Sequence, residues 1–180
     1  MKKIEYPDDV FCIENFLSKS ECQQLINESE NIGYEKSKIN TLNGEQLDLT
    51  IRNNDRIFFD DVNLSIRFFK LLKPFLPAKI NDWKLYSLNE RFRFYRYVID
   101  QYFVWHGDGS FRRNYSEVSK LSLIIYLNHE FAGGNTDFAG FTIKPQEGMA
   151  LIFPHKLLHQ GSSVKNGCKY VLRTDVMYSR

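Results

Sequence analysis

The spacing of hydrophobic residues near the start of the chain predicts an amphipathic helix from Ser18 to Ile32. Ser18 is followed three residues later by Glu21, which is the capping-box pattern of a helix N-terminus. Gly33 follows the last apolar residue and is a typical stop signal. This segment is therefore expected to form a helix with one apolar face.

A second helix is expected from Asp60 to Pro74, with Asp60 or Asp61 as its N-cap. Its apolar face would be formed by Leu64, Phe68, Leu71 and Leu72. The polar stretch between the two helices, 36–54, contains Asn43-Gly44, which indicates a hairpin or a loop.

After Pro77 the pattern changes to a period of two, which is typical of β-strands. The expected strands are 91–98, 121–127, 148–153 and 169–178, separated by glycine-rich turns. We therefore expect a mainly β, α+β protein in which residues 1–80 provide helical support and 81–180 form the core. The simplest architecture is an antiparallel sandwich or barrel with helices on one outer face.

Composition places the chain among single-domain globular proteins. It has 180 residues and a net charge of +2, so one domain spanning 1–180 is expected and a nucleic-acid partner is not. Its three cysteines form no CxxC pair, which argues against a disulfide framework and fits a reducing compartment. The apolar run 121–127 is too short to cross a membrane, and the start of the chain is charged. We expect a cytoplasmic protein, and nothing in the sequence specifies its oligomeric state.

The sequence His106-Gly107-Asp108 offers an imidazole and a carboxylate that can point to the same side of an extended segment. His159 follows the strand expected at 148–153 and is a third candidate ligand. Two histidines and one carboxylate on one face of a metal form the facial triad of non-haem Fe(II) oxygenases. His155, four residues before His159, is expected to be a structural or pocket residue.

The order of several motifs supports this interpretation. They are Leu123-Ile-Ile-Tyr-Leu-Asn128, Phe131-Ala-Gly-Gly-Asn-Thr-Asp-Phe138, Gly148-Met-Ala-Leu-Ile-Phe153, His159-Gln-Gly-Ser-Ser-Val164 and Gly167-Cys-Lys-Tyr-Val-Leu-Arg173. Together they resemble the 2-oxoglutarate- and Fe(II)-dependent dioxygenases, in the prolyl 4-hydroxylase-like branch, from about Arg91 to Tyr178. The resemblance implies a double-stranded β-helix, also called a jelly roll or cupin-like fold, with N-terminal helices outside it.

The resemblance also implies roles for single residues. His106 and Asp108 resemble the proximal iron ligands, and His159 resembles the distal one. Lys169 or Arg173 would pair with the far carboxylate of 2-oxoglutarate, because both share one face of the last strand. The pattern favours Lys169 slightly.

Further residues are expected to line the same pocket. Tyr97 and Tyr126 resemble tyrosines of the co-substrate pocket, and Thr136 occupies the end of a Gly-Gly-Asn-Thr element. The rings of Trp105 and Phe153 are also expected to line or back the site.

The activity implied is hydroxylation of a C–H bond with Fe(II), 2-oxoglutarate and O2, with release of succinate and CO2. Ascorbate is a candidate reductant. The substrate would be a protein or peptide residue, as in prolyl 4-hydroxylases, or a free amino acid or other small molecule. The alternative is a non-catalytic jelly-roll protein that binds a metal or a small molecule, and the full ligand set with its cationic strand argues against it.

Two loops are candidates for substrate binding. The segment 52–59 would be a flap that brings Asn54 and Arg56 to the mouth of the site, or simply a loop that leads into a strand. The segment 109–116 contains Arg112, which would attract an acidic substrate or lie on the surface as an ordinary charge.

Overall fold

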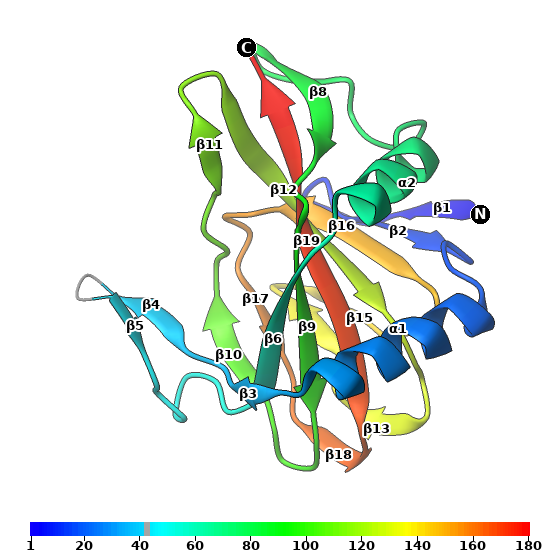
Figure 1. Cartoon of the computed structure of the whole chain (residues 1–180), viewed down its shortest axis with the longest axis vertical. Coiled ribbons are helices and arrows are strands. Elements are labelled where there is room, and N and C mark those ends of the chain that lie inside the picture. Colours follow the sequence, from blue (N-terminus) through cyan, green and yellow to red (C-terminus); the bar gives the residue numbers. More distant parts are fainter. Residues whose placement is uncertain (42–43) are drawn as a thin grey trace.

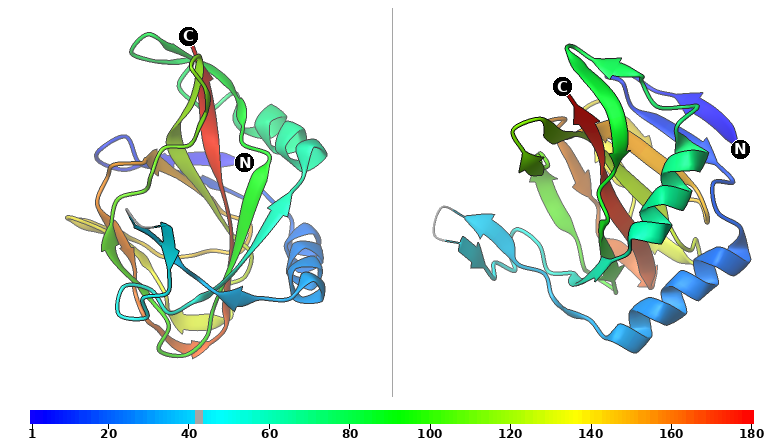
Figure 2. Two further views of the ribbon diagram at one scale, coloured as in Figure 1. Left: turned by 60° about the vertical axis from the view of Figure 1, so that its left-hand side comes forward. Right: turned by 45° about the horizontal axis from the view of Figure 1, so that its top comes forward.

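The computed structural model describes residues 1–41 and 44–180, which form two facing β-layers with two helices outside one of them (Figures 1 and 2). The large sheet has the order β1 (Lys2–Glu5), β2 (Phe11–Glu14), β16 (Ala150–Pro154), β12 (Glu117–Tyr126), β19 (Lys169–Ser179), β9 (Arg91–Tyr97), β6 (Asp55–Asp60) and β3 (Glu35–Lys36). Beside this path lie β7 (Lys79–Ile80), β8 (Trp83–Leu88) and β11 (Arg112–Asn114).

The second layer is a smaller sheet that carries part of the candidate site. Its order is β10 (Phe103–His106), β17 (His159–Gly161), β14 (Thr136–Phe138) and β15 (Phe141–Ile143). Two further pairs are β13 (Phe131–Gly133) with β18 (Val164–Gly167), and β4 (Ile39–Thr41) with β5 (Gly44–Gln46). Every strand pair in the described residues is antiparallel, so the predicted mainly β fold with antiparallel pairing is confirmed.

The two helices begin where the sequence predicts. Helix α1 (Lys19–Ile32) has Ser18 as its N-cap, and the reciprocal capping box with Glu21 is present. Helix α2 (Val62–Leu72) is capped by Asp61, whereas Asp60 is the last residue of β6. Neither helix, nor any other in the described residues, is long and apolar enough to cross a membrane.

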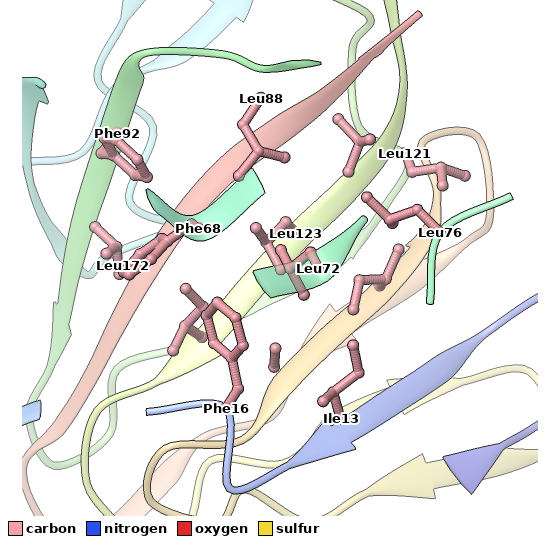
Figure 3. Close-up of a cluster of buried hydrophobic side chains, with 14 of the residues drawn as sticks. Ile13, Phe16, Phe68, Leu72, Leu76, Leu88, Phe92, Leu121, Leu123 and Leu172 are labelled. Carbon is pink, nitrogen blue, oxygen red and sulfur yellow. The ribbon is translucent and has the colours of Figure 1, made fainter. Parts of the chain in front are cut away.

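Both helices pack on the outer face of the large sheet (Figure 2). Figure 3 shows how Phe68 and Leu72 of α2 lie over Leu123 and Leu172, on two neighbouring central strands. All four of these side chains are fully buried. Burying each of them is worth roughly 1.5–3 kcal/mol, so this cluster fixes α2 against the sheet.

The opposite face of the same strands points between the two sheets. Because side chains alternate across a strand, Leu123 and Ile125 face the helices while Tyr126 faces the small sheet. On β9, Phe94 faces the helices and Tyr95 faces inward. The alternation that predicted these strands therefore also divides their side chains between the hydrophobic core under the helices and the space between the two sheets, where the candidate site lies.

The N-terminal residues contribute strands as well as helices. β1, β2, β3 and β6 all belong to the large sheet, and β6 pairs with β9 over its whole length. The segment 52–59, for which a flap or a loop leading into a strand was expected, contains β6 and a bridge from Arg52 to Phe103. Before it, β4 and β5 form an antiparallel pair that projects from the body of the fold (Figure 1). The expected turn residue Asn43 lies outside the described residues.

Candidate metal centre

Strand pairing brings the three candidate ligands together. β10 and β17 are antiparallel neighbours in the small sheet, and His106 lies opposite His159 in their register. Asp108 follows β10, and its backbone N–H donates to the His155 carbonyl at 2.6 Å. The Nε2 atoms of His106 and His159 lie 3.7 and 3.8 Å from the two Asp108 oxygens. One ligand atom from each of the three residues falls within 4.8 Å of the others.

Both histidines are held in the tautomer that a metal ligand needs. Nδ1 of His106 lies 2.7 Å from the Val104 carbonyl, and Nδ1 of His159 lies 2.9 Å from the Leu157 carbonyl. A carbonyl only accepts, so each Nδ1 donates its proton and each Nε2 keeps a free lone pair.

Burial keeps the two rings neutral. It lowers the pKa of His106 to about 4, and it also lowers the pKa of His159 below its usual value. Neutral imidazoles with a free Nε2, beside an ionised carboxylate, are the donor set that suits Fe(II).

Asp108 is held as a carboxylate by two partners on its second oxygen. Ser122 donates to Oδ2 at 2.5 Å, and Nη2 of Arg173 lies 3.0 Å from the same atom. Burial would raise the pKa of Asp108, but the Arg173 charge and the Ser122 hydrogen bond outweigh it and lower the pKa. Oδ1, which faces His106, is left for a metal.

Behind Asp108 runs a chain of buried hydrogen bonds. Ser122 Oγ lies 2.8 Å from Nδ1 of His155, and Nε2 of His155 lies 2.7 Å from Ser119 Oγ. Ser119 in turn accepts from the Phe111 N–H at 2.7 Å. His155 is thus buried behind Asp108 and does not line the cavity, and each of its two ring nitrogens contacts a serine hydroxyl.

Lys169 lines the same cavity as the three candidate ligands. Its ammonium donates to the Gly134 carbonyl at 2.6 Å and lies over the rings of Tyr97 and Tyr126, at 5.2 and 5.5 Å. Gly134 has φ +61°, where glycine is favoured, and a side chain there would press on Lys169. Burial lowers the pKa of Lys169 to about 7, and no carboxylate in the described residues forms an ion pair with it.

The tyrosines and Thr136 surround this lysine. Tyr126 shares a 2.7 Å hydrogen bond with Thr136, and both residues line the cavity with Tyr97. Burial raises the pKa of Tyr97 to about 12, so its phenol stays protonated and able to donate. Phe153 packs its edge against His159 at 4.6 Å, as a residue that backs the site would. Trp105 differs from expectation, because 44% of it is exposed and it does not line the cavity.

The candidate substrate residues occupy different positions. Asn54 is fully buried, accepts two hydrogen bonds from Arg52 and does not line the cavity. Arg56 lies opposite Tyr95 in the β6–β9 register and pairs with Glu45 at 3.1 Å. Arg112, on β11, is exposed and is not part of the cavity lining.

Two residues of the site escaped the sequence reasoning. Ser122 carried a usable signal, because it is a polar residue on the same strand face as Tyr126 within an apolar run. For Arg52 the sequence contains no comparable signal, because only the bridge to Phe103 places it beside the cavity.

The two layers with a His-Asp-His donor set between them define a double-stranded β-helix of the non-haem iron oxygenase class. A model of the 2OG-Fe(II) oxygenase superfamily matches residues 92–174, which include all three candidate ligands and Lys169. This match, together with the similar proteins below, indicates a 2-oxoglutarate-dependent iron oxygenase, a class that requires Fe(II), 2-oxoglutarate and O2. The non-catalytic alternative is not favoured.

Known proteins similar to the chain are named as prolyl hydroxylases. A putative prolyl 4-hydroxylase of Acanthamoeba polyphaga mimivirus is 25% identical over 183 residues, covering 89% of this chain and 71% of that protein.

Solved structures share the fold at lower identity. The viral collagen prolyl hydroxylase of Paramecium Bursaria Chlorella virus-1, solved with 2-oxoglutarate, has TM-score 0.66 and 24% identity, covering 95% of this chain and 96% of that one. A Pseudomonas putida prolyl-4-hydroxylase has TM-score 0.70 and 13% identity, with coverages of 97% and 94%. A Trichoplax adhaerens prolyl hydroxylase, in complex with a hypoxia inducible factor peptide, has TM-score 0.69 and 13% identity, with coverages of 96% and 84%.

Proposed function

We propose that this oxygenase hydroxylates a prolyl residue of a peptide or protein, and that residues 1–180 act as a single catalytic domain. The observation that carries the proposal is the convergence of two neutral imidazoles and one carboxylate on a point beside a buried, unpaired lysine. The prolyl hydroxylase names of the similar proteins support the choice of substrate. A free amino acid is the second candidate substrate.

His106, Asp108 and His159 would hold the iron through Nε2, Oδ1 and Nε2. Their geometry fits this role because each histidine already donates its other nitrogen to a carbonyl, which orients the ring. Bound iron, with 2-oxoglutarate and O2, supplies the oxidising power that inserts oxygen into a C–H bond and releases succinate and CO2. The chain itself positions the reactants and excludes water.

Lys169 would bind the far carboxylate of 2-oxoglutarate. Among the described residues that line the cavity, it is the cation without a carboxylate partner, whereas Arg173 is paired with Asp108 and Asp175. Tyr97 and the Thr136 hydroxyl lie beside it and can donate to the same carboxylate. A carboxylate would also restore the cationic form of Lys169, which burial alone disfavours.

Arg173 would then act as a positioning residue. It holds Oδ2 of Asp108 and leaves Oδ1 for the metal. Asp175, which pairs with both Arg173 and Arg93, keeps the guanidinium in place from the other side.

The three candidate substrate residues would contribute in different ways. Arg56, on the inward face of β6, would lie at the rim beside bound substrate. Asn54 would act through Arg52, and Arg112 would attract acidic groups from the surface. Ascorbate would keep the iron reduced. The three free cysteines support a reducing compartment, and we place the protein in the cytoplasm.

The test is mass spectrometry of proline-containing peptides after incubation with the protein, Fe(II), 2-oxoglutarate and ascorbate. A gain of one oxygen atom on proline, dependent on 2-oxoglutarate and lost in His106→Ala, is expected. Oxygen found only on free amino acids would favour the second candidate substrate. Product formed equally by His106→Ala would refute the assigned site.

A further inference from the structure

Arg52 is a buried cation without a carboxylate partner. Only 5% of it is exposed, and its Nε and Nη2 both donate to the single Oδ1 of Asn54, at 3.1 and 3.0 Å. Within residues 1–41 and 44–180, no carboxylate lies within ion-pair distance of it, and its Nη1 donates to no acceptor. One edge of the guanidinium is therefore left free.

Other arginines on this side of the large sheet are neutralised, among them Arg91, which pairs with Asp60 at 2.9 Å. Arg56 pairs with Glu45 at 3.1 Å, and Arg93 pairs with Asp175 at 3.4 Å. Arg173 pairs with Asp108 at 3.0 Å. Arg52 thus differs from these paired guanidinium groups in having no carboxylate partner.

Arg52 also lies next to the candidate metal centre. Its guanidinium carbon is 4.2 Å from the ring centroid of Phe103 and 4.9 Å from that of Tyr95, and both rings line the cavity. Phe103 stacks on the other side against His106, with centroids 3.4 Å apart. Only the Phe103 ring therefore separates the Arg52 guanidinium from His106, a candidate metal ligand.

The energetics of this arrangement favour an anionic ligand. Contacts with two aromatic faces stabilise the cation only in part, and a neutral amide oxygen is a weaker partner than a carboxylate. A buried charge normally needs a partner of opposite charge, because removing it from water is costly.

We propose that Arg52 binds a carboxylate of the substrate, so that this oxygenase selects acidic substrates. The inference rests on the proposed function and adds the class of substrate. A guanidinium held in one plane by Asn54 and two rings presents its free edge as a fork that matches a planar carboxylate. The carboxylate comes either from an Asp or Glu side chain beside the target residue in a peptide, or from the α-carboxylate of a free amino acid.

The experiment compares matched probes that differ only in one carboxylate. The full-length protein is loaded with Mn(II) and 2-oxoglutarate and titrated calorimetrically with acetyl-Gly-Pro-Glu-Gly-amide against its Gln counterpart, and with L-proline against L-prolinamide. The wild type is expected to bind the carboxylate member of one pair at least about tenfold more tightly, as a charge-assisted hydrogen bond implies. The pair that shows the preference identifies the source of the carboxylate.

Variants distinguish a role of Arg52 in binding the substrate carboxylate from a role in supporting Phe103 and His106. Arg52→Met is expected to abolish most of the preference, and Arg52→Lys to keep part of it. Arg91→Met removes an exposed arginine of β9 that pairs with Asp60, and is expected to keep the full preference. If Arg52 only supported Phe103 and His106, Arg52→Met would weaken Mn(II) binding and leave the ratio between matched probes unchanged. That result, or equal binding of acid and amide in both pairs by the wild type, would overturn the proposal.

Succinate release from the same probes with Fe(II) tests the oxygenase separately. A carboxylate preference that depends on Arg52, without succinate release, would support the anion site while the proposed function fails. Succinate release with equal binding of acid and amide would support the function and overturn the anion site.

Discussion

Arg173 and Asp108 form an ion pair of 3.0 Å inside the cavity, on the carboxylate oxygen that does not face His106. Lys169, four residues away on the same strand face, has no such partner and contacts a carbonyl and two rings. The two cations that the sequence left as alternatives thus have different surroundings. Arg173 is paired with a candidate metal ligand, and Lys169 is available to a bound anion.

Lys169→Met is expected to weaken 2-oxoglutarate binding by about ten- to a hundredfold, because a charge-assisted contact with the far carboxylate is lost. Arg173→Met, the matched neutral variant on the same strand, is expected to change this affinity little. Titration of 2-oxoglutarate into Mn(II)-loaded protein measures both. The reverse order of effects would assign the co-substrate to Arg173.

Arg173→Met is expected to destabilise the metal-free protein by about 3–5 kcal/mol, because Asp108 is left as a buried charge without its ion-pair partner. Added Mn(II) should reduce the difference in free energy of unfolding between wild type and Arg173→Met, because the metal becomes the new partner of Asp108. Denaturant unfolding with and without Mn(II) gives both values. Arg91→Met, which breaks the exposed pair with Asp60, should lose no more than about 1 kcal/mol. Equal losses in free energy of unfolding for Arg173→Met and Arg91→Met would contradict the role of Arg173 as the partner of Asp108.

The lowered pKa of Lys169 predicts how stability depends on pH. Between about pH 7 and the ordinary lysine value of 10.5, the unfolded chain carries a proton on this side chain that the folded chain releases. The contribution of Lys169 to stability therefore rises with pH across this window. Relative to wild type without 2-oxoglutarate, Lys169→Met should be more stable at pH 6, and the difference should shrink toward pH 10. A difference that is constant with pH would show that Lys169 titrates normally.

Ser122→Ala is expected to weaken Mn(II) binding by about ten- to a hundredfold, because it removes a hydrogen bond that orients a metal ligand. Ser119→Ala is the matched control: it removes a buried hydroxyl that contacts His155 but not Asp108. It should reduce stability and leave metal affinity close to wild type. Equal metal affinities in the two variants would mean that Ser122 does not act through Asp108.

Local chemistry explains what the sequence could predict. Ser18 and Glu21 specify a helix start by hydrogen bonds within four residues, and alternation specifies which side of β12 is buried. The candidate ligand set follows from local spacing, because His106 and Asp108 are two residues apart and His159 follows a clear strand, and its role as a ligand set stays a prediction. These features need no knowledge of distant contacts.

The remaining features depend on register between distant strands. Arg52 reaches the cavity only because it bridges to Phe103, and Arg173 meets Asp108 only because β19 packs beside β12 and β9. Strands β1 and β2 were not predicted, because they are four residues each and their place at the edge of the sheet comes from pairing with β16. Composition and spacing contain no signal for such contacts.

The most direct test of the central claim is succinate formation from 2-oxoglutarate with Fe(II) and O2, measured for wild type, His106→Ala and His129→Ala. His129 is an exposed histidine outside the cavity that faces Glu147, and it controls for loss of an imidazole. If His106, Asp108 and His159 hold the iron, wild type and His129→Ala will form succinate at similar rates, and His106→Ala will form none above the protein-free background. Equal succinate formation by wild type and His106→Ala would contradict the claim.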